Sequence, residues 1–198
     1  QSCAACAGEV AQGVKVIQMA VENGAAAILL ETEQEASWDT LDGVSVPIVA
    51  IPNLRRQVGE IASRFYKTAE NKALHIVGVT GTNGKSTCCF LIAQLYSLLA
   101  YSGAVIGTLG YGVPGEAFIE TGVTTPDVVS NHRILHELQS AGHDAVAIEV
   151  SSHGLDQGRV DAIPFSVAVF TILTQDHLDY HGSLASYAQT KSLLFGLP

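Results

Sequence analysis

A glycine-rich loop lies between an apolar run and a helical pattern, and this arrangement constrains the fold more than any other feature of the sequence. Residues 75–80 are predicted to form a strand and residues 85–100 a helix, with Gly81-Thr82-Asn83-Gly84 between them. Such a loop directs successive backbone N–H groups and a helix N-terminus at one point, which favours anion binding. The sequence therefore predicts an α/β domain with a phosphate-binding loop.

The alternation of strands and helices continues beyond this loop. Strands are predicted at 104–108, 145–150 and 166–171, and helices at 127–141 and 183–195. The strands are continuous apolar runs, which is typical of a parallel sheet covered by helices on both faces. Ligands bind at the carboxyl ends of the strands in such sheets, so we expect the functional residues there.

The first 70 residues carry a second, smaller α/β pattern. A helix from residue 10 breaks at Asn23-Gly24, a strand follows at 27–30, and a further strand and helix are predicted at 46–51 and 54–66. The apolar face of the last helix comprises Leu54, Val58, Ile61, Ala62 and Phe65. The polar residues 67–72 are the expected linker, which divides the chain into parts 1–70 and 71–198.

Composition limits the classes of partner. The net charge is −9 with only ten Lys and Arg residues, whereas nucleic-acid binding needs clustered positive charge. Residues 87–115 contain no charged side chain, but polar and glycine positions split them into a helix and a strand rather than a membrane span. We expect a cytoplasmic protein that binds neither nucleic acid nor membrane.

The four cysteines do not form a disulfide framework. Cys88 and Cys89 are adjacent within an expected helix, and Cys3 and Cys6 have the spacing of half a zinc or redox site without a second pair nearby. Reduced thiols fit a cytosolic protein. The chain opens on Gln1 and stops at Pro198 directly after an apolar helical pattern, so we expect a piece of a longer protein.

The residues that follow the glycine-rich loop fit nucleotide binding. Lys85 adds positive charge for phosphates, and the Ser86 hydroxyl is a suitable Mg²⁺ ligand. The strict phosphate-loop pattern wants glycine where this chain has Val79, so the match is incomplete. The alternative is a glycine-rich turn that only caps a helix, and the strand–loop–helix context favours nucleotide.

Two further polar residues follow neighbouring strands. Glu149 lies in the apolar run 145–150, where a buried carboxylate needs a cation or a hydrogen-bonding network. His177 follows the next strand within Asp176-His177-Leu178-Asp179-Tyr180-His181-Gly182. Beside a phosphate loop, these side chains suggest Mg²⁺ held by protein and phosphate oxygens. A hydrogen-bonded polar cluster without metal is the alternative.

Lys191 lies on the expected helix 183–195 among apolar side chains. Its default interpretation is a surface residue whose aliphatic stem covers apolar neighbours. If it faces the metal site instead, burial and nearby cations would lower its pKa. A neutral amine can react with CO₂ to give a carbamate, which is a metal-binding carboxylate.

Four motifs in one order make the sequence resemble the Mur ligases of bacterial cell-wall synthesis, most closely their MurE branch. The motifs are Gly81-Thr-Asn-Gly-Lys-Ser-Thr87, Thr124-Thr125-Pro126, Glu149-Val-Ser-Ser-His-Gly-Leu155 with Gln157 and Arg159, and Asp176 to Gly182 followed by Lys191. The resemblance covers about residues 45 to 198. This sequence departs from the family's usual pattern at Val123, where the family often has Asn, and at Ile172, where Thr-Asn-Leu is usual.

The resemblance implies a fold, a reaction and cofactors. The fold would be an incomplete Mur ligase central domain with a parallel sheet (71–198), preceded by part of a small N-terminal domain that binds the UDP substrate (1–70). The amino-acid-binding C-terminal domain would lie outside this chain. The reaction would join meso-diaminopimelate or L-lysine to UDP-N-acetylmuramoyl-L-alanyl-D-glutamate with ATP, through an acyl phosphate, in a monomer with two Mg²⁺ ions.

The resemblance also implies roles for individual residues. ATP phosphates would bind Gly81, Thr82, Asn83, Gly84, Lys85, Ser86 and Thr87. The UDP-sugar peptide would contact Thr124, Thr125, Ser151, Gln157 and Arg159. The Mg²⁺ ligands would be Ser86, Glu149, His177 and Lys191 as a carbamate, and the catalytic set would be Lys85, Glu149, His177 and Lys191.

Two other functions remain open from the residues. A folylpolyglutamate synthetase shares the phosphate loop and a metal-binding histidine, but the Thr124-Thr125 pair and residues 149–159 oppose it. A generic phosphate-loop NTPase or nucleotide-binding module would hydrolyse or bind ATP without a carboxylate substrate, and would have no use for Lys191.

Overall fold

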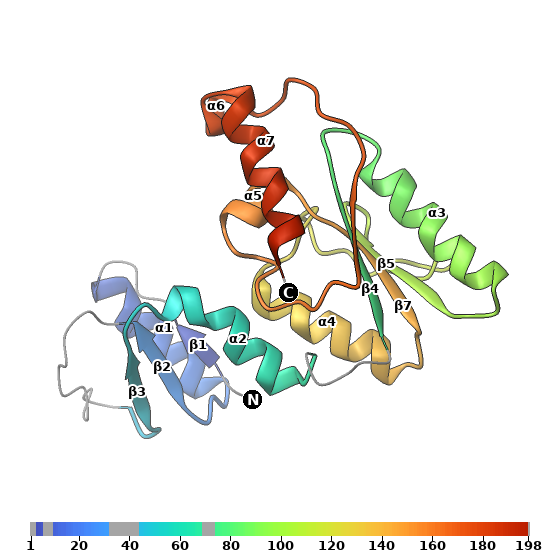
Figure 1. Cartoon of the computed structure of the whole chain (residues 1–198). Coiled ribbons are helices and arrows are strands. Elements are labelled where there is room, and N and C mark those ends of the chain that lie inside the picture. The colour runs from blue at the N-terminus through green and yellow to red at the C-terminus, as the bar shows by residue number, and fades with distance from the viewer. Residues whose placement is uncertain (1–2, 6–9, 32–43, 69–73, 198) are drawn as a thin grey trace. The chain divides into compact units, whose positions relative to one another are not determined.

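The computed structural model describes residues 3–5, 10–31, 44–68 and 74–197 (Figure 1). It divides into two compact units, residues 1–58 and 59–198, with the division inside helix α2 (Leu54–Tyr66). Most of the expected linker, the polar segment 32–43 and Cys6 lie outside the described residues, as does the side chain of Cys3.

The first unit contains a small parallel sheet. Strands β1 (Cys3–Ala5), β2 (Ile28–Glu31) and β3 (Ile48–Ile51) pair in that order, and helix α1 (Val10–Glu22) connects the first two. Its core includes Ile17, Ala25, Ile28 and Leu30. The helix ends where predicted, because Gly24 takes a left-handed backbone conformation (φ 86°) that stops it. Strand β1 was not predicted.

The second unit is built on a five-stranded sheet in the order β6-β5-β7-β4-β8. Its strands are β4 (His75–Thr80), β5 (Gly103–Gly107), β6 (Gly110–Gly112), β7 (Ala145–Glu149) and β8 (Val167–Phe170). All neighbours are parallel except β5 and β6. The predicted α/β fold with a parallel sheet is therefore confirmed. The antiparallel edge strand β6 was not predicted, because it is only three residues long.

The helices of this unit follow the predicted pattern with local differences. They are α3 (Lys85–Leu98), α4 (Val128–Ser140), α5 (Ser152–Asp156), α6 (Leu178–His181), α7 (Leu184–Ser192) and the 3₁₀ helix η1 (Leu193–Gly196). The Asp127 side chain caps α4 by accepting from the Ser130 N–H. The single helix expected over residues 183–195 is formed by two elements, α7 and η1. Helices α5 and α6 were not predicted, because they are too short to show a helical period in the sequence.

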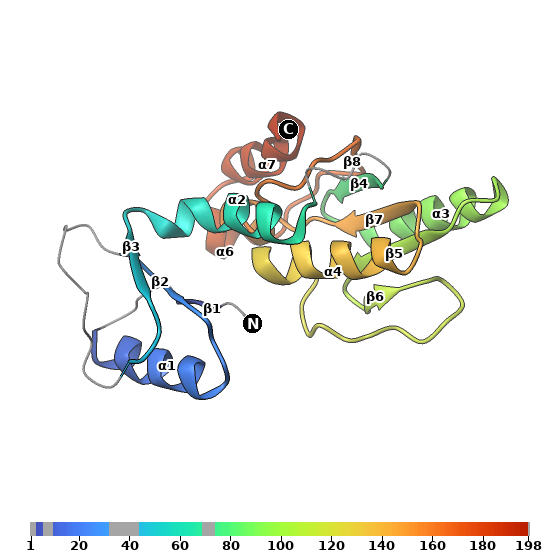
Figure 2. The same cartoon turned by 90° about the horizontal axis from the view of Figure 1, so that it is seen from below.

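Helices lie on both faces of the five-stranded sheet (Figures 1 and 2), and alternate residues of β4, β5 and β7 pack into two different clusters. Ile76, Ile106, Val146 and Ile148 pack in one cluster with residues of α4, α5 and η1. Val77, Val79, Val105 and Ala147 form a second cluster with Cys89 and Ala93 of α3. Successive residues of these strands therefore point to opposite faces of the sheet, and both faces are buried. The result is a three-layer domain with the sheet between two layers of helices.

Two expectations about apolar segments have different outcomes. Leu54, Val58 and Ala62 of α2 are buried, whereas Phe65 on the same helix face is 59% exposed. It instead makes an edge-on contact with Tyr66, at 4.9 Å between ring centroids. The uncharged residues 87–115 were expected to split into a helix and a strand, and α3 does end at Leu98 before β5 begins. No helix in the described ranges has the length and hydropathy to cross a membrane.

Candidate functional site

The glycine-rich loop connects the carboxyl end of β4 to the N-terminus of α3, as predicted. Gly81 and Gly84 have φ values of 143° and 84°, which favour glycine. A Cβ atom on Gly81 would also collide with the Thr171 hydroxyl. The Thr82 N–H donates to the Ile172 carbonyl (2.7 Å), and the Thr171 hydroxyl donates to the Asn83 carbonyl (2.6 Å). The segment after β8 therefore holds the loop in shape.

Lys85 lies over this loop. Its Nζ donates to the carbonyl oxygens of Gly81 and Thr82, each at 2.9 Å. Burial lowers the pKa of Lys85, while the nearby carboxylates of Glu149 and Asp176 act in the opposite direction. The loop thus concentrates a lysine and backbone N–H groups beside two carboxylates, a set that suits a phosphate with a bound cation.

Glu149 ends β7 and is only 1% exposed. One carboxylate oxygen, Oε2, accepts from the Ser86 hydroxyl (2.9 Å) and from the Thr108 hydroxyl (3.2 Å). The other, Oε1, accepts from the Thr108 N–H (3.1 Å). The expectation that a carboxylate in this apolar strand has hydrogen-bonding partners is confirmed, and Ser86 joins it directly to the phosphate loop.

Lys191 is 1% exposed, so its interpretation as a surface residue was wrong. Its Nζ donates to the Gly81 carbonyl (2.9 Å) and lies 4.5 Å from the centroid of the Tyr187 ring. Burial, and then the positive charge of Lys85, lower the pKa of Lys191 to about 8. A substantial fraction of this amine is therefore neutral near physiological pH.

His177 contacts this group through Tyr187: the two ring centroids are 6.3 Å apart, and the Lys191 Nζ atom lies over the Tyr187 ring. His177 has a left-handed backbone (φ 50°) directly before α6, and its ring packs edge-on against His153 at 4.9 Å between centroids. In the part of the chain that the structure describes, no hydrogen bond or ion pair joins Glu149 to His177 or Lys191, and no three His, Cys, Asp or Glu residues are arranged to hold a metal. The predicted metal set therefore stays a prediction.

The five residues predicted to contact the UDP-sugar peptide form one hydrogen-bonded network. The Thr125 hydroxyl donates to the Glu149 carbonyl (2.9 Å) and accepts from the Ser151 N–H (3.0 Å). Arg159 donates to the Thr125 carbonyl (2.9 Å) and to the Gln157 side-chain oxygen (2.9 and 2.6 Å). The Thr124 hydroxyl lies 3.1 Å from the hydroxyl of Thr108, which also bonds Glu149.

Three residues of this region were missed by the sequence interpretation: Gly107, Thr108 and Thr171. All three come from or directly follow the carboxyl ends of β5 and β8. A Cβ atom on Gly107 would overlap the Glu149 carboxylate, so glycine is what admits that side chain. Their position after strands was a usable signal, but no charge or motif marked them.

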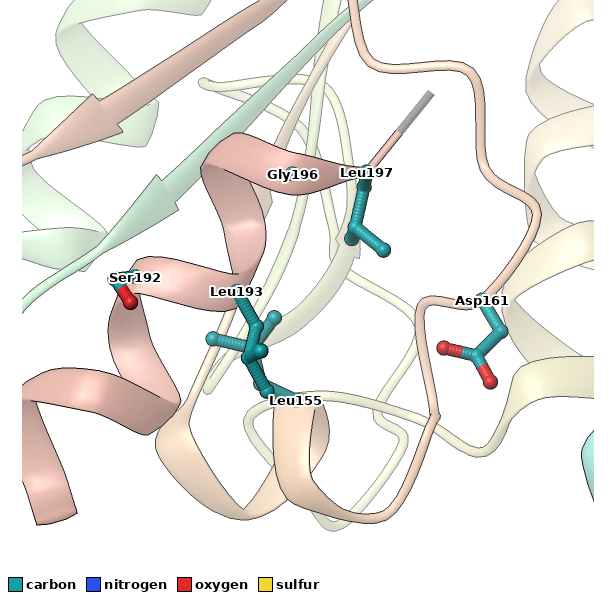
Figure 3. Close-up of a pocket in the computed structure, with 6 residues that line it drawn as sticks. All are labelled: Leu155, Asp161, Ser192, Leu193, Gly196 and Leu197. Carbon is teal, nitrogen blue, oxygen red and sulfur yellow. The ribbon is translucent and has the colours of Figure 1, made fainter.

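A separate pocket of about 390 Å³ lies between α5 and the end of the chain (Figure 3). Its lining comprises Leu155, Asp161, Ser192, Leu193, Gly196 and Leu197. Figure 3 shows Leu155 and Leu193 on one side and Asp161 on the other. None of the predicted site residues lines it.

Comparisons with known proteins show the family of this chain. The Mur ligase middle domain matches residues 79–197. A UDP-N-acetylmuramoyl-L-alanyl-D-glutamate--2,6-diaminopimelate ligase of Xanthomonas oryzae pv. oryzae is 47% identical over 196 residues, which are 98% of this chain and 38% of the relative.

Two solved structures extend the comparison. A structure of a ligase with the same name superposes with a TM-score of 0.79 at 34% identity, covering 98% of this chain and 38% of the other. MurF ligase from Thermotoga maritima in complex with ADP shares the fold, with a TM-score of 0.59 at 24% identity, covering 98% of this chain and 40% of the other. This chain spans about two fifths of the length of these relatives. It belongs to the Mur ligase family, and residues 79–197 correspond to the middle domain of that family.

Proposed function

We propose that the protein containing this chain is an ATP-dependent ligase that adds a diamino acid to UDP-N-acetylmuramoyl-L-alanyl-D-glutamate during peptidoglycan synthesis. The observation that carries the proposal is the position of Glu149. It joins the phosphate loop through Ser86 and joins the Thr124–Arg159 network through Thr108 and its own backbone. The proposed nucleotide site and the proposed dipeptide site would therefore share one buried carboxylate.

ATP would lie with its phosphates on residues 81–87. The backbone N–H groups at the start of α3 and the Lys85 ammonium supply positive charge there. The Ser86 and Glu149 oxygens are 2.9 Å apart and are hard donors, so they fit Mg²⁺, which neutralises phosphate charge when bound. The Thermotoga MurF structure is named as a complex with ADP, which supports a nucleotide ligand for the proposed protein.

Lys191 would act as a carbamate, and together with Glu149 and His177 it would hold a second Mg²⁺. Burial of its Nζ against the phosphate-loop carbonyl and the neighbouring Lys85 both favour a neutral amine, which is the form that reacts with CO₂. The new carboxylate would exchange a buried positive charge for a negative one next to Lys85. That exchange relieves the repulsion between the two ammonium groups.

The muramoyl dipeptide would bind at Thr124, Thr125, Ser151, Gln157 and Arg159. Its D-glutamate side-chain carboxylate would attack the γ-phosphate, and the amine of the diamino acid would then displace phosphate from the resulting acyl phosphate. The protein's contribution would be positioning and charge stabilisation, since Lys85 on the loop would neutralise phosphate charge that would otherwise repel the attacking carboxylate.

The remaining assignments rest on the relatives. Their names support 2,6-diaminopimelate as the amino acid. Residues 1–70 would belong to the part that binds the UDP group and residues 71–198 to the part that binds ATP, with the amino acid bound by a domain beyond this chain. We expect a monomer in the bacterial cytoplasm, where ATP and the UDP-linked precursor are present.

The test is the substrate dependence of ADP release by the full-length protein. We expect ADP only when UDP-muramoyl dipeptide and diaminopimelate are both present, together with a ligated product detectable by mass spectrometry. Lysine in place of diaminopimelate serves as the test of amino-acid choice. ADP release that is indifferent to the dipeptide would mean a generic NTPase and would overturn the proposal.

A further inference from the structure

Thr108 occupies the junction between the two halves of the site, and neither the motifs nor the family comparison assigns it a role. Its N–H donates to Glu149 Oε1 (3.1 Å) and its hydroxyl lies 3.2 Å from Glu149 Oε2. The same hydroxyl lies 3.1 Å from the Thr124 hydroxyl. One residue thus contacts both oxygens of a buried carboxylate and a side chain of the second polar site.

Hydrogen-bond chemistry fixes the direction of these contacts. An ionised carboxylate only accepts hydrogen bonds, so the single proton of the Thr108 hydroxyl points to Glu149. The bond between Thr108 and Thr124 then needs the proton of Thr124. With that proton engaged, the Thr124 oxygen has only lone pairs left to offer to a ligand.

We propose that Thr108 is a positioning residue that orients the Glu149 carboxylate and makes Thr124 a pure hydrogen-bond acceptor for an N–H group of the bound peptide substrate. This inference rests on the proposed function, because the peptide amides of the UDP-muramoyl dipeptide supply such N–H groups. Two local features support it. Glu149 is almost completely buried, and Gly107 lacks the Cβ atom that would push the carboxylate away from Thr108.

The first test measures binding of UDP-muramoyl dipeptide to the full-length protein by calorimetry, in chelator and without ATP. Thr108→Val keeps the shape and the N–H but removes the hydroxyl. We expect it to weaken binding by about 3- to 10-fold, the equivalent of one net hydrogen bond. Thr108→Ser restores the hydroxyl and should bind like the wild type. Ser97→Ala, which removes an exposed hydroxyl bonded within α3, is the matched control.

The route through Thr124 is tested by a double-mutant cycle. If Thr108 acts by directing the Thr124 proton, Thr108→Val changes dipeptide affinity only when Thr124 is present. Adding it to Thr124→Val should then have no further effect. Independent, multiplying effects would overturn the proposal, as would wild-type affinity in Thr108→Val. If Thr108→Val does not fold, Thr124→Val alone must weaken binding, because it removes the same hydrogen bond from the other side.

The effect on Glu149 has its own readout. Calorimetric titration of Mg²⁺ into the protein–ADP complex should show weaker binding in Thr108→Val by about tenfold, as expected for a lost partner of a metal ligand. ADP affinity itself should be unchanged. Unchanged Mg²⁺ affinity would contradict the orienting role. Failure of the wild type to bind the dipeptide at all would instead refute the proposed function, so the two failures are distinguishable.

Discussion

The Lys191 Nζ atom donates a 2.9 Å hydrogen bond to the carbonyl oxygen of Gly81, 110 residues earlier in the chain. This contact ties α7 to the phosphate loop. It also places two lysines on the same loop, since Lys85 bonds the same carbonyl. Burial lowers the pKa of both lysines, and in Lys191, where the positive charge of Lys85 adds to the effect, the pKa falls to about 8.

The first prediction concerns the carbamate on Lys191. Full-length protein incubated with ¹³C-labelled bicarbonate should show a carbamate resonance by ¹³C NMR. At fixed dissolved CO₂ it should grow as pH rises through about 8, because the neutral amine is the reactive form. Lys191→Arg keeps the charge but should lose the resonance and the ligase activity. Lys67→Asn, at an exposed site whose left-handed backbone suits Asn, should keep both. A resonance that persists in Lys191→Arg would contradict the assignment.

The second prediction concerns Glu149→Gln. The amide keeps the shape of the side chain and can still accept from the Thr108 N–H, but the negative charge is lost. Ligase activity should fall at least about 100-fold, as for loss of one preorganised charge-stabilising group. Thermal stability should not decrease, because a neutral amide is easier to bury than a carboxylate. Glu116→Gln, which changes an exposed residue, is the control. Equal ligase activity in the two variants would show that Glu149 is not part of the site.

The third prediction concerns Gly107→Ala. The added Cβ atom would overlap the Glu149 carboxylate, so the side chain or the strand end must shift. We expect a loss of about 1–3 kcal/mol in the free energy of unfolding, typical of overpacking, together with loss of activity. Gly196→Ala meets no atom within 4 Å and serves as the control in denaturant titrations. A Gly107→Ala protein with wild-type stability would show that the Glu149 carboxylate does not pack tightly against residue 107.

The fourth prediction concerns pH and the buried His132 of α4. Its ring nitrogens lie 2.6 Å from the Thr68 hydroxyl and 3.0 Å from the Asp161 carbonyl oxygen. Burial lowers the pKa of His132 below 6.5, although the Asp161 carbonyl and the charge of Glu60 oppose this. As the pH falls, His132 in the unfolded chain is therefore protonated near pH 6.5, whereas His132 in the folded protein is protonated only at lower pH.

Above pH 6.5 His132 should therefore not change the free energy of unfolding with pH. Below pH 6.5 the free energy of unfolding should decrease as the pH falls. The slope from one such group is at most about 1.4 kcal/mol per pH unit. Denaturant titrations of the full-length protein between pH 7.5 and about pH 5, in the range where His titrates, should show a smaller slope in His132→Gln than in the wild type. His136→Gln, on the exposed side of the same helix, should keep the wild-type slope. Equal slopes in all three proteins would contradict the prediction.

Much of the fold was predictable because the strands and long helices carry clear periodic patterns. The boundaries of β4 and α2 match the predicted residues, and those of α3, α4 and β7 differ by two residues or fewer. Short elements such as β6, α5 and α6 were missed because three to five residues cannot show a period. Helical spacing placed Phe65 on the apolar face of α2 but could not show that this position is exposed.

The sequence by itself determined the phosphate loop, the parallel sheet and the residues that mark the family. These depend on local order: glycines between a strand and a helix, apolar runs of strand length, and motifs at fixed spacing. Tertiary structure alone decided that Lys191 is buried on Gly81, that Gly107 leaves room for Glu149, and that Thr108 connects Glu149 to Thr124. Such contacts join residues that are far apart in the chain, and only packing of the strand ends brings them within hydrogen-bonding distance.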